Sequence, residues 1–236
     1  MTETIKIFTD GAAKGNPGRG GYGAVISHGE TVTEIGAHKE RTTNNEMELQ
    51  AVVEALKVVQ DSGQTTEIYT DSKYVMQGAT SWIFGWLKND WQTKAGTAVL
   101  NKELWQELLT LLKQVRIEWH KVPGHVGIIG NERADTIASD FAAKGKYDLY
   151  SGPKKEYRFD LSDTSYDEAK AKQRSDARKK QSQKAYSYIS LLDGVVQTHK
   201  TWGECEQRVK GKRGTRFKKS FDSAHEREII ADFGKD

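Results

Sequence analysis

The stretches Ile7-Phe8-Thr9-Asp10-Gly11 and Ile68-Tyr69-Thr70-Asp71-Ser72 share one pattern. Each contains an apolar run of the kind that predicts a β-strand, and each run ends in an aspartate. If the two strands are parallel neighbours, both carboxylates lie at the carboxyl edge of the sheet, where α/β folds place their ligands. We therefore expect Asp10 and Asp71 to be adjacent.

The sequence around these stretches alternates between strand-like and helix-like patterns. Strands are predicted at residues 5–10, 22–27, 31–37, 67–70 and 115–120, and helices at 44–61, 72–78, 81–87, 101–113 and 131–144. The first strand leads through a glycine-rich segment, residues 11–21, into two strands joined by a turn, which indicates an antiparallel start. The complete order is typical of an α/β fold with a mixed five-stranded sheet and flanking helices.

Two further acids are expected near the same edge of the sheet. Glu48 shares a helical stripe with the apolar residues Val52 to Val59, so its carboxylate points towards the sheet. Asp135 lies in the first turn of the last helix, where the helix dipole favours an anion. Each acid by itself could be only a cap or a turn former. Four gathered carboxylates are costly without a cation, and oxygen donors favour Mg²⁺ or Mn²⁺ over zinc.

The composition predicts a chain with one core of ordinary size and a small second unit. It has 236 residues, of which 36% are hydrophobic and 29% are charged. No apolar run approaches the roughly 20 residues that cross a bilayer, and the N-terminus enters a strand pattern without an export signal. We expect a cytoplasmic protein, or a nuclear one if the host has a nucleus, without a membrane partner. The single cysteine, Cys205, leaves neither an internal disulfide nor a thiolate cluster for zinc.

Charge is distributed unevenly along the chain. Residues 1–145 carry 15 Lys and Arg against 18 Asp and Glu, whereas residues 146–236 carry 21 against 15. A basic appendage on a mildly acidic body suggests a polyanionic partner, and a solvated charged tail is the alternative. We expect a monomer.

The second half of the chain divides into two parts by composition. Residues 147–184 have few aliphatic side chains and many Lys, Arg, Asp, Ser and Gln, so we expect a polar linker. From residue 185 the pattern returns, with strands at 186–192 and 195–199, a helix at 202–209, a basic segment at 210–219 and a helix at 223–233. The sequence thus predicts a first domain (1–146), a linker (147–184) and a small α+β domain (185–236).

Short motifs with a characteristic order run through residues 1–145. They are Thr9-Asp10-Gly11, Gly15-Asn16-Pro17-Gly18, Thr42-Thr43-Asn44-Asn45-Glu46-Met47-Glu48-Leu49, Thr70-Asp71-Ser72, and Gly124-His125-Val126-Gly127 followed by Gly130-Asn131-Glu132-Arg133-Ala134-Asp135. In this order they closely resemble type 1 ribonuclease H. The resemblance implies the ribonuclease H-like fold and endonucleolytic cleavage of the RNA strand of an RNA/DNA hybrid, which leaves 5′-phosphate and 3′-hydroxyl ends.

The same resemblance implies the roles of the acids. Two Mg²⁺ ions, with Mn²⁺ as a substitute, would bind at the four carboxylates and support in-line displacement at a phosphodiester. Asp10 would bridge both ions, Glu48 and Asp71 would complete one side, and Asp135 would complete the other. His125 is implied to be a mobile group that helps proton transfer or product departure, although a lone loop histidine is usually only solvated.

The resemblance also implies the substrate contacts. Asn16 approaches the RNA sugars, and Asn44 and Asn45 work in the minor groove, where 2′-hydroxyls distinguish RNA from DNA. The residues that would bind a phosphate of the DNA strand are Arg41, Thr43 and Asn101. A protrusion beside the DNA strand is implied to contain Trp82, Trp86, Trp91 and Trp105, with core packing as the alternative role for about half of them. The segment Trp86 to Trp91 has one lysine, so we expect weak hybrid binding by the first domain.

Three segments of the last domain resemble the small hybrid-binding domain of eukaryotic ribonuclease H. They are Thr201-Trp202-Gly203-Glu204-Cys205, Val209-Lys210-Gly211 and Arg216-Phe217-Lys218-Lys219-Ser220-Phe221. The resemblance implies that Trp202 and Phe217 stack on sugars and that Lys218 and Lys219 contact phosphates. Core aromatics and solvated lysines are the alternative. The C-terminal position and the short turn at residues 192–194 depart from the family, and double-stranded RNA is an open alternative ligand.

Two other functions stay open on the sequence. A non-catalytic hybrid-binding protein on the same scaffold would not need the complete set of four acids. A DNA-cutting relative with the same fold would lack the motifs Gly15-Asn16-Pro17-Gly18 and Thr42-Thr43-Asn44-Asn45, which are implied to contact RNA.

Overall fold

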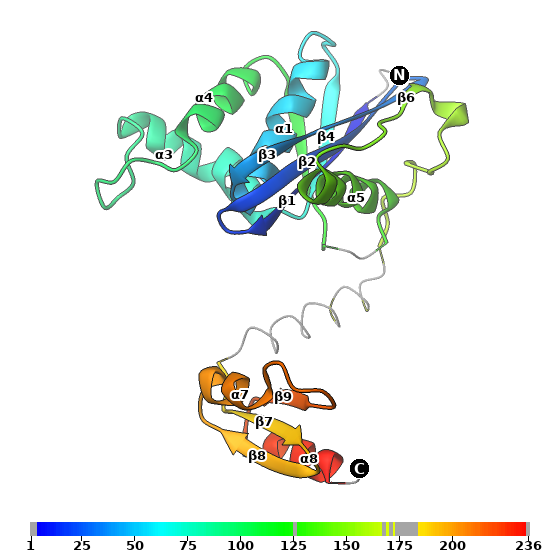
Figure 1. Ribbon diagram of the computed structural model, residues 1–236. Coiled ribbons are helices and arrows are strands. Elements are labelled where there is room, and N and C mark those ends of the chain that lie inside the picture. Colours follow the sequence, from blue (N-terminus) through cyan, green and yellow to red (C-terminus); the bar gives the residue numbers. More distant parts are fainter. Residues whose placement is uncertain (1–3, 125–126, 167–168, 170–171, 173–183, 235–236) are drawn as a thin grey trace. The chain divides into compact units, whose positions relative to one another are not determined.

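The computed structural model describes residues 4–124, 127–166, 169, 172 and 184–234 (Figure 1). The chain divides into two compact units, Met1–Ala171 and Lys172–Asp236, which are described separately. Among the described residues, no helix combines the length and the apolar character that crossing a bilayer requires.

The first unit is built on a mixed sheet with the strand order β5-β4-β1-β2-β3-β6. The strands are β1 (Ile5–Gly15), β2 (Gly18–His28), β3 (Thr31–Thr42), β4 (Thr65–Thr70), β5 (Arg116–Lys121) and β6 (Ser151–Pro153). The pairs β1–β4 and β4–β5 are parallel, and the other pairs are antiparallel. The predicted mixed α/β sheet is confirmed, with β6 as a sixth strand beyond the five that were expected.

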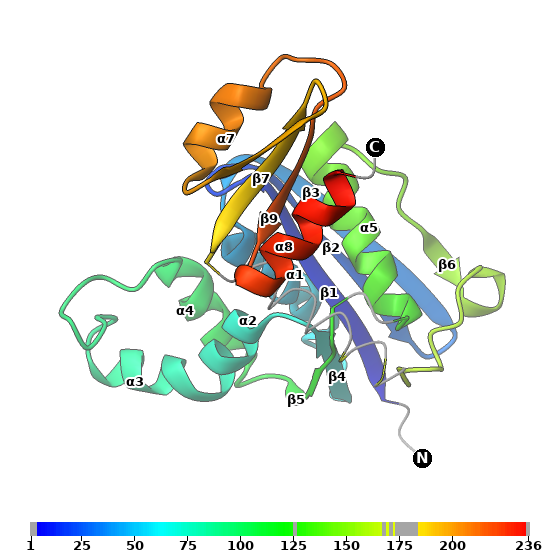
Figure 2. The same ribbon diagram turned by 90° about the horizontal axis from the view of Figure 1, so that it is seen from below.

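Helices cover both faces of this sheet (Figure 2). They are α1 (Asn44–Val59), α2 (Lys73–Gln77), the π-helical turn η1 (Gly78–Trp82), α3 (Ile83–Lys88), α4 (Lys102–Leu111) and α5 (Ile129–Lys144). The helices α1 and α4 enclose one core with residues such as Ile7, Leu56 and Trp105. On the other face, α5 packs against β1, β2 and β3 over Phe8, Val25 and Ile137. Apolar side chains that alternate along β1 therefore fill two cores.

Most of the glycine-rich segment after Asp10 is strand, whereas the predicted strands end at residue 10 and resume at residue 22. The strands β1 and β2 stay paired as far as Gly15 and Gly18, and only the tip between them turns. The glycines are needed for close approach. A Cβ atom on Gly11 would lie 2.2 Å from the backbone nitrogen of Glu48 in α1, and one on Gly23 would lie 2.5 Å from the carbonyl oxygen of Ala134 in α5. Both helices therefore rest directly on the strand backbone.

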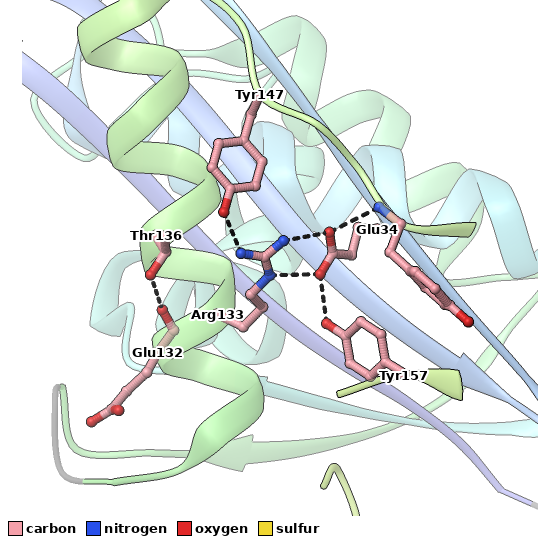
Figure 3. A network of polar contacts seen from close by, with 7 residues as sticks. Glu34, Glu132, Arg133, Thr136, Tyr147 and Tyr157 are labelled. Carbon is pink, nitrogen blue, oxygen red and sulfur yellow. Dashed lines mark hydrogen bonds and ion pairs between the residues drawn. The ribbon is translucent and has the colours of Figure 1, made fainter. Parts of the chain in front are cut away.

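Residues 147–161, here called the strap, lie in the part of the sequence expected to be linker but pack on the first unit. The strand β6 in the strap pairs with β3, and Leu161 is buried. Tyr147 and Tyr157 contact the core under α5 and donate or accept hydrogen bonds at a buried ion pair (Figure 3). Aliphatic content does not predict this packing, because three of the strap residues that pack against this core are tyrosines, Tyr147, Tyr150 and Tyr157.

The second unit is a small antiparallel sheet with two helices. Its strands, in the order β8-β7-β9, are β7 (Ser187–Leu192), β8 (Val195–His199) and β9 (Arg216–Ser220), and its helices are α7 (Trp202–Val209) and α8 (Ser223–Phe233). Ile189 and Leu191 form its core with Ile229 and Phe233 of α8. Thr201 and Glu204 form a capping box that begins α7, as expected for a short helix without much buried surface.

A chain that ends at residue 146 should be less stable than a chain that ends at residue 166. The shorter chain loses the buried Leu161 and the tyrosine hydroxyls that contact the buried pair of Glu34 and Arg133. We expect the free energy of unfolding to fall by several kcal/mol, because burying a leucine contributes about 1.5–3 kcal/mol and a hydrogen bond to a charged group about 1.5–3 kcal/mol. Urea denaturation of the two chains measures the difference, and equal stabilities would show that the strap is only a tether.

Candidate functional site

The register of β1 and β4 places Asp10 beside Asp71. Their parallel pairing ends at Phe8 and Tyr69, whose rings stack with centroids 4.9 Å apart. Both aspartates follow two residues later, on the same side of the sheet as these rings. Asp10 lies inside β1 because this strand continues along β2, whereas Asp71 lies just after the end of β4.

Glu48 is held at the start of α1 by two hydrogen bonds. Asn44 Nδ2 donates to Glu48 Oε1 at 2.7 Å, and Ser72 Oγ donates to Glu48 Oε2 at 2.5 Å. Ser72 directly follows Asp71, so the second bond connects α1 to the end of β4. The direct contact of α1 with Gly11 places Glu48 beside the strand residue that follows Asp10.

Asp135 comes from the opposite face of the sheet. It lies in the second turn of α5, half-buried, and Ser139 Oγ donates to Asp135 Oδ1 at 3.4 Å. The preceding residue, Ala134, contacts β2 at Gly23, which is the strand partner of Asp10. The missing side chain at Gly23 therefore brings α5, and with it Asp135, close to Asp10.

Asp10 is only 8% exposed, and the charges of the three other acids act on it. Burial raises the pKa of Asp10 well above its ordinary value, and the charges of Asp71, Asp135 and Glu48 raise it further. The amide of Gly11, which donates to Asp10 Oδ1 at 2.7 Å, opposes this shift in pKa. Four carboxylates from α1, β1, α5 and the end of β4 thus share one site.

Burial is also the main cause that raises the pKa of Glu48, and the charge of Asp71 acts in the same direction. The hydrogen bonds from Ser72 and Asn44 lower this pKa in part. Crowded carboxylates with raised pKa values are stabilised by a divalent cation. Because the donors are carboxylate oxygens, the residues present fit Mg²⁺ or Mn²⁺ better than a thiophilic metal.

The substrate residues implied for the first unit lie in several places. Asn16 is exposed at the tip between β1 and β2, and Arg41 is exposed near the end of β3. Thr43 caps α1 by accepting a hydrogen bond from the amide of Glu46 at 3.2 Å, and Asn45 is exposed in its first turn. Asn101 precedes α4 and donates to the hydroxyl of Tyr74 at 3.0 Å. His125 lies outside the described residues.

The tryptophans of the protrusion divide into core and surface. Trp105 is fully buried and Trp91 nearly so, which makes them core residues. Trp82 is 37% exposed, and its ring centroid lies 5.7 Å from that of Trp86. The adjacent helix α3 exposes Phe84 and other apolar side chains, so this surface offers aromatic contacts with little positive charge.

In the second unit, an aromatic row lies on the face opposite α8. The ring centroid of Trp202 lies 5.2 Å from that of Phe217 and 5.6 Å from that of Tyr188. Tyr188 pairs with Lys219 across β7 and β9, so Lys219 belongs to the same face. Sequence reasoning missed Tyr188, which only the strand register connects to the row.

Lys218 points to the other face of this small sheet. Its Nζ lies 2.9 Å from Asp232 Oδ2 and 5.6 Å from the ring centroid of Phe233, both in α8. Neighbouring residues of a strand face opposite sides, so Lys218 and Lys219 cannot both lie beside Trp202 and Phe217. The two lysines, grouped together in the sequence analysis, have different surroundings.

A further group of ligand-type side chains lies on β4 and β5. The ligand atoms of Glu67, Glu118 and His120 are all within 4.8 Å of one another. Tyr69 donates to Glu67 Oε2 at 2.7 Å and stacks on His120 with ring centroids 4.6 Å apart. The sequence signal for this group is the alternation of side chains in Glu67-Ile68-Tyr69 and in Glu118-Trp119-His120, which places every second residue of each strand on one face. Such acidic groups are common without a metal, and the group is not assigned a role.

Comparison with known proteins identifies relatives of the first unit. Residues 2–143 match the family model described as RNase H. A ribonuclease H of Bradyrhizobium sp. (strain ORS 278) is 49% identical over 142 residues, which are 60% of this chain and 92% of that protein. A ribonuclease H of Acidovorax sp. (strain JS42) is 52% identical over 137 residues, which are 57% and 92% of the two chains.

A solved structure has the same fold. It is that of LC9-RNase H1, described as a type 1 RNase H with the type 2 active-site motif. The TM-score is 0.58 at 28% sequence identity, and the match covers 69% of this chain and 83% of that chain. The family match to residues 2–143 ends before the second unit begins.

Replacing Asp10 with Asn should stabilise the metal-free protein near neutral pH. The ionised carboxylate is disfavoured in the folded state, whose pKa lies above the unfolded value of about 3.9. Stability therefore falls as the pH rises from about 3.9 through the folded pKa, and Asp10→Asn escapes this loss. We expect a gain of roughly 1–3 kcal/mol at about pH 7.5, the usual cost of an unsatisfied buried polar group.

Thermal unfolding with a chelator present, repeated from acidic to neutral pH, measures this gain. It should vanish below about pH 4, where the carboxyl is protonated in both states. Added Mg²⁺ should stabilise the wild-type protein more than Asp10→Asn. A variant that is less stable than the wild type at neutral pH would contradict the electrostatic account of the site.

Proposed function

The chain belongs to the ribonuclease H family, and we propose that it hydrolyses the RNA strand of RNA/DNA hybrids and leaves 5′-phosphate and 3′-hydroxyl ends. One observation carries this proposal: Asp10 is buried among Glu48, Asp71 and Asp135, and its pKa is raised by burial and by their charges. Charge of this density is suited to two divalent metal ions.

The acids would hold Mg²⁺, with Mn²⁺ as a substitute, through carboxylate oxygens. Two such ions, when bound, supply the positive charge that promotes ionisation of the attacking water and stabilises the leaving oxygen. The chain itself holds the carboxylates in place beforehand. Asn44 and Ser72 bind one oxygen each of Glu48, and the amide of Gly11 binds Asp10. His125 is proposed to move a proton or to help the product leave.

The hybrid would lie across the start of α1 and the exposed tip between β1 and β2. Arg41 and Asn45 are exposed, and Thr43 caps α1, whose N-terminus is favourable for a phosphate. Asn16 at the tip would approach the RNA sugars, where contact with a 2′-hydroxyl distinguishes RNA from DNA. Asn101 and Trp82 would contact the DNA strand.

The second unit would act as a binding module for the hybrid, with double-stranded RNA as an alternative ligand. Trp202 and Phe217 are 39% and 51% exposed, which is unusual for large aromatic side chains that serve only as core. Tyr188 extends their row and Lys219 flanks it. A tethered module raises the local concentration of substrate without changing the chemistry.

Cleavage of an end-labelled RNA/DNA hybrid tests the proposed reaction. The full-length chain should cut the RNA strand with Mg²⁺ or Mn²⁺, should be inactive with a chelator, and should leave a DNA duplex intact. Phosphatase and ligase treatment of the fragments identifies their ends. Asp10→Asn is the control for a contaminating nuclease. Hybrid binding without any cleavage would instead favour a non-catalytic binding protein, and cutting of the DNA duplex would favour a DNA-cutting relative.

Two neighbouring lysines provide a matched test of the module. Lys219 lies on the aromatic face, whereas Lys218 is paired with Asp232 on the other face. In the Asp10→Asn background, which does not cleave, Lys219→Ala should weaken hybrid binding several-fold and lower the slope of log K against log[salt] by about 1. Lys218→Ala should have a smaller effect on both quantities. Equal effects of the two variants would contradict the assignment of the binding face.

A further inference from the structure

The strap completes a network of polar contacts around one buried ion pair (Figure 3). Arg133 Nε donates to Glu34 Oε1 at 2.6 Å, and Arg133 Nη2 donates to Glu34 Oε2 at 2.8 Å. From the strap, the Tyr157 hydroxyl donates to Glu34 Oε1 at 2.6 Å and the Tyr150 amide donates to Glu34 Oε2 at 3.0 Å. Arg133 Nη1 donates to the hydroxyl of Tyr147. Both charged groups are thereby satisfied inside the protein.

Aromatic rings enclose the guanidinium of Arg133 as well. Its Cζ lies 4.8 Å from the ring centroid of Tyr147 and 5.2 Å from that of Phe159, at cation–π distance. The side chain of Glu34 is fully buried and that of Arg133 is 8% exposed. A planar group with this many fixed contacts has little freedom to rotate or shift. The strap therefore holds Arg133 in one position.

Arg133 and Asp135 belong to the same helix, α5, but face different directions. Residues two apart in an α-helix project about 200° from each other around the axis. The network therefore holds α5 on the side opposite Asp135. Any rotation of α5 about its axis would displace Arg133 and Asp135 in opposite directions, so contacts that fix Arg133 also fix Asp135.

Apolar packing holds the N-terminal part of α5 against the sheet, and the strap adds polar contacts on the other side of the helix. The N-cap residue, Ile128, has no side chain that could cap the helix, although Glu132 Oε1 accepts a hydrogen bond from the amide of Gly127 at 3.0 Å. On the sheet side, α5 packs closely on Gly23, and the ring of Phe8 lies directly against Gly130 in its first turn. The strap adds directional hydrogen bonds to this packing, because it orders the ion pair that holds Arg133.

We propose that the strap is a positioning device for the acid cluster: Tyr147 and Tyr157, acting through Arg133, fix the rotation of α5 and thereby the direction of Asp135. The strap lies beyond residues 2–143, which the family model matches, so this role is not part of the matched core. The inference rests on the proposed function, because it assigns Asp135 to metal binding.

Conservative variants of the full-length chain test this role. Tyr157→Phe and Tyr147→Phe each remove one hydroxyl from the network and keep the ring. Tyr150→Phe is the matched control, because its hydroxyl donates to Pro153 O at 2.7 Å within the strap and its amide bond to Glu34 is preserved. Circular dichroism sets a temperature at which every variant is fully folded.

Two readouts separate positioning from stability. Calorimetric titration of Mn²⁺ into the substrate-free protein should give a dissociation constant about 3- to 10-fold higher for Tyr157→Phe and Tyr147→Phe. This effect is somewhat smaller than that of losing a group that hydrogen-bonds directly to a metal-binding side chain. The Mg²⁺ concentration for half-maximal hybrid cleavage should rise by a similar factor, with KM for the hybrid unchanged. Tyr150→Phe should match the wild type in both.

The outcomes are distinguishable from failure of the proposed function. If the wild-type chain does not cleave the hybrid, the proposed function fails, whatever the variants do. If the wild type cleaves and Tyr157→Phe and Tyr147→Phe lower only the melting temperature, while their metal dissociation constants equal that of Tyr150→Phe, the strap is merely stabilising and the positioning role is overturned.

Discussion

Direct contact between helix backbone and strand backbone is the constraint on which the acid site depends. At Gly11 a side chain would collide with the start of α1, and at Gly23 it would collide with α5. Glycine inside a strand costs roughly 0.5–1 kcal/mol relative to alanine. The benefit is that Glu48 and Asp135, which approach from opposite faces of the sheet, both reach Asp10 at its edge. A larger residue at either position would push the helix away from the strand and so separate the acids.

Two buried carboxylates of the first unit, those of Glu34 and Asp10, have different partners. Glu34 meets a guanidinium, a phenol and an amide, and although burial alone would raise its pKa, hydrogen bonds from Arg133, Tyr157 and Tyr150 hold it below the ordinary value. Asp10 is buried to a similar degree, but other acids surround it and its pKa is raised. Glu34 is satisfied by the protein itself, whereas Asp10 is stabilised best by an external cation. Structural and functional acids are thus distinguished by their partners and not by their burial.

Much of the site could be predicted from local patterns, because the repeated strand ends at Asp10 and Asp71 and the helical stripe of Glu48 follow backbone geometry. The strap could not, since linker composition was judged by aliphatic content and its packing uses tyrosines around a charge on β3. The strand pattern could not be followed through the glycine segment, because its contacts are with helices distant in sequence. Lys218 and Lys219 look equivalent in sequence, and only the β7–β9 register separates them.

Chemistry and affinity are divided between the two units in the proposed function. The protrusion of the first unit exposes Trp82 and Phe84 but carries little positive charge, so long-range attraction of a polyanion from this surface is weak. The excess of basic residues lies after residue 145, together with the exposed pair Trp202 and Phe217. Stacking on an aromatic face is tolerant of sequence, and phosphate contacts carry no sequence information. The module can therefore hold any suitable duplex, and the choice of the RNA strand must be made where 2′-hydroxyls meet the first unit.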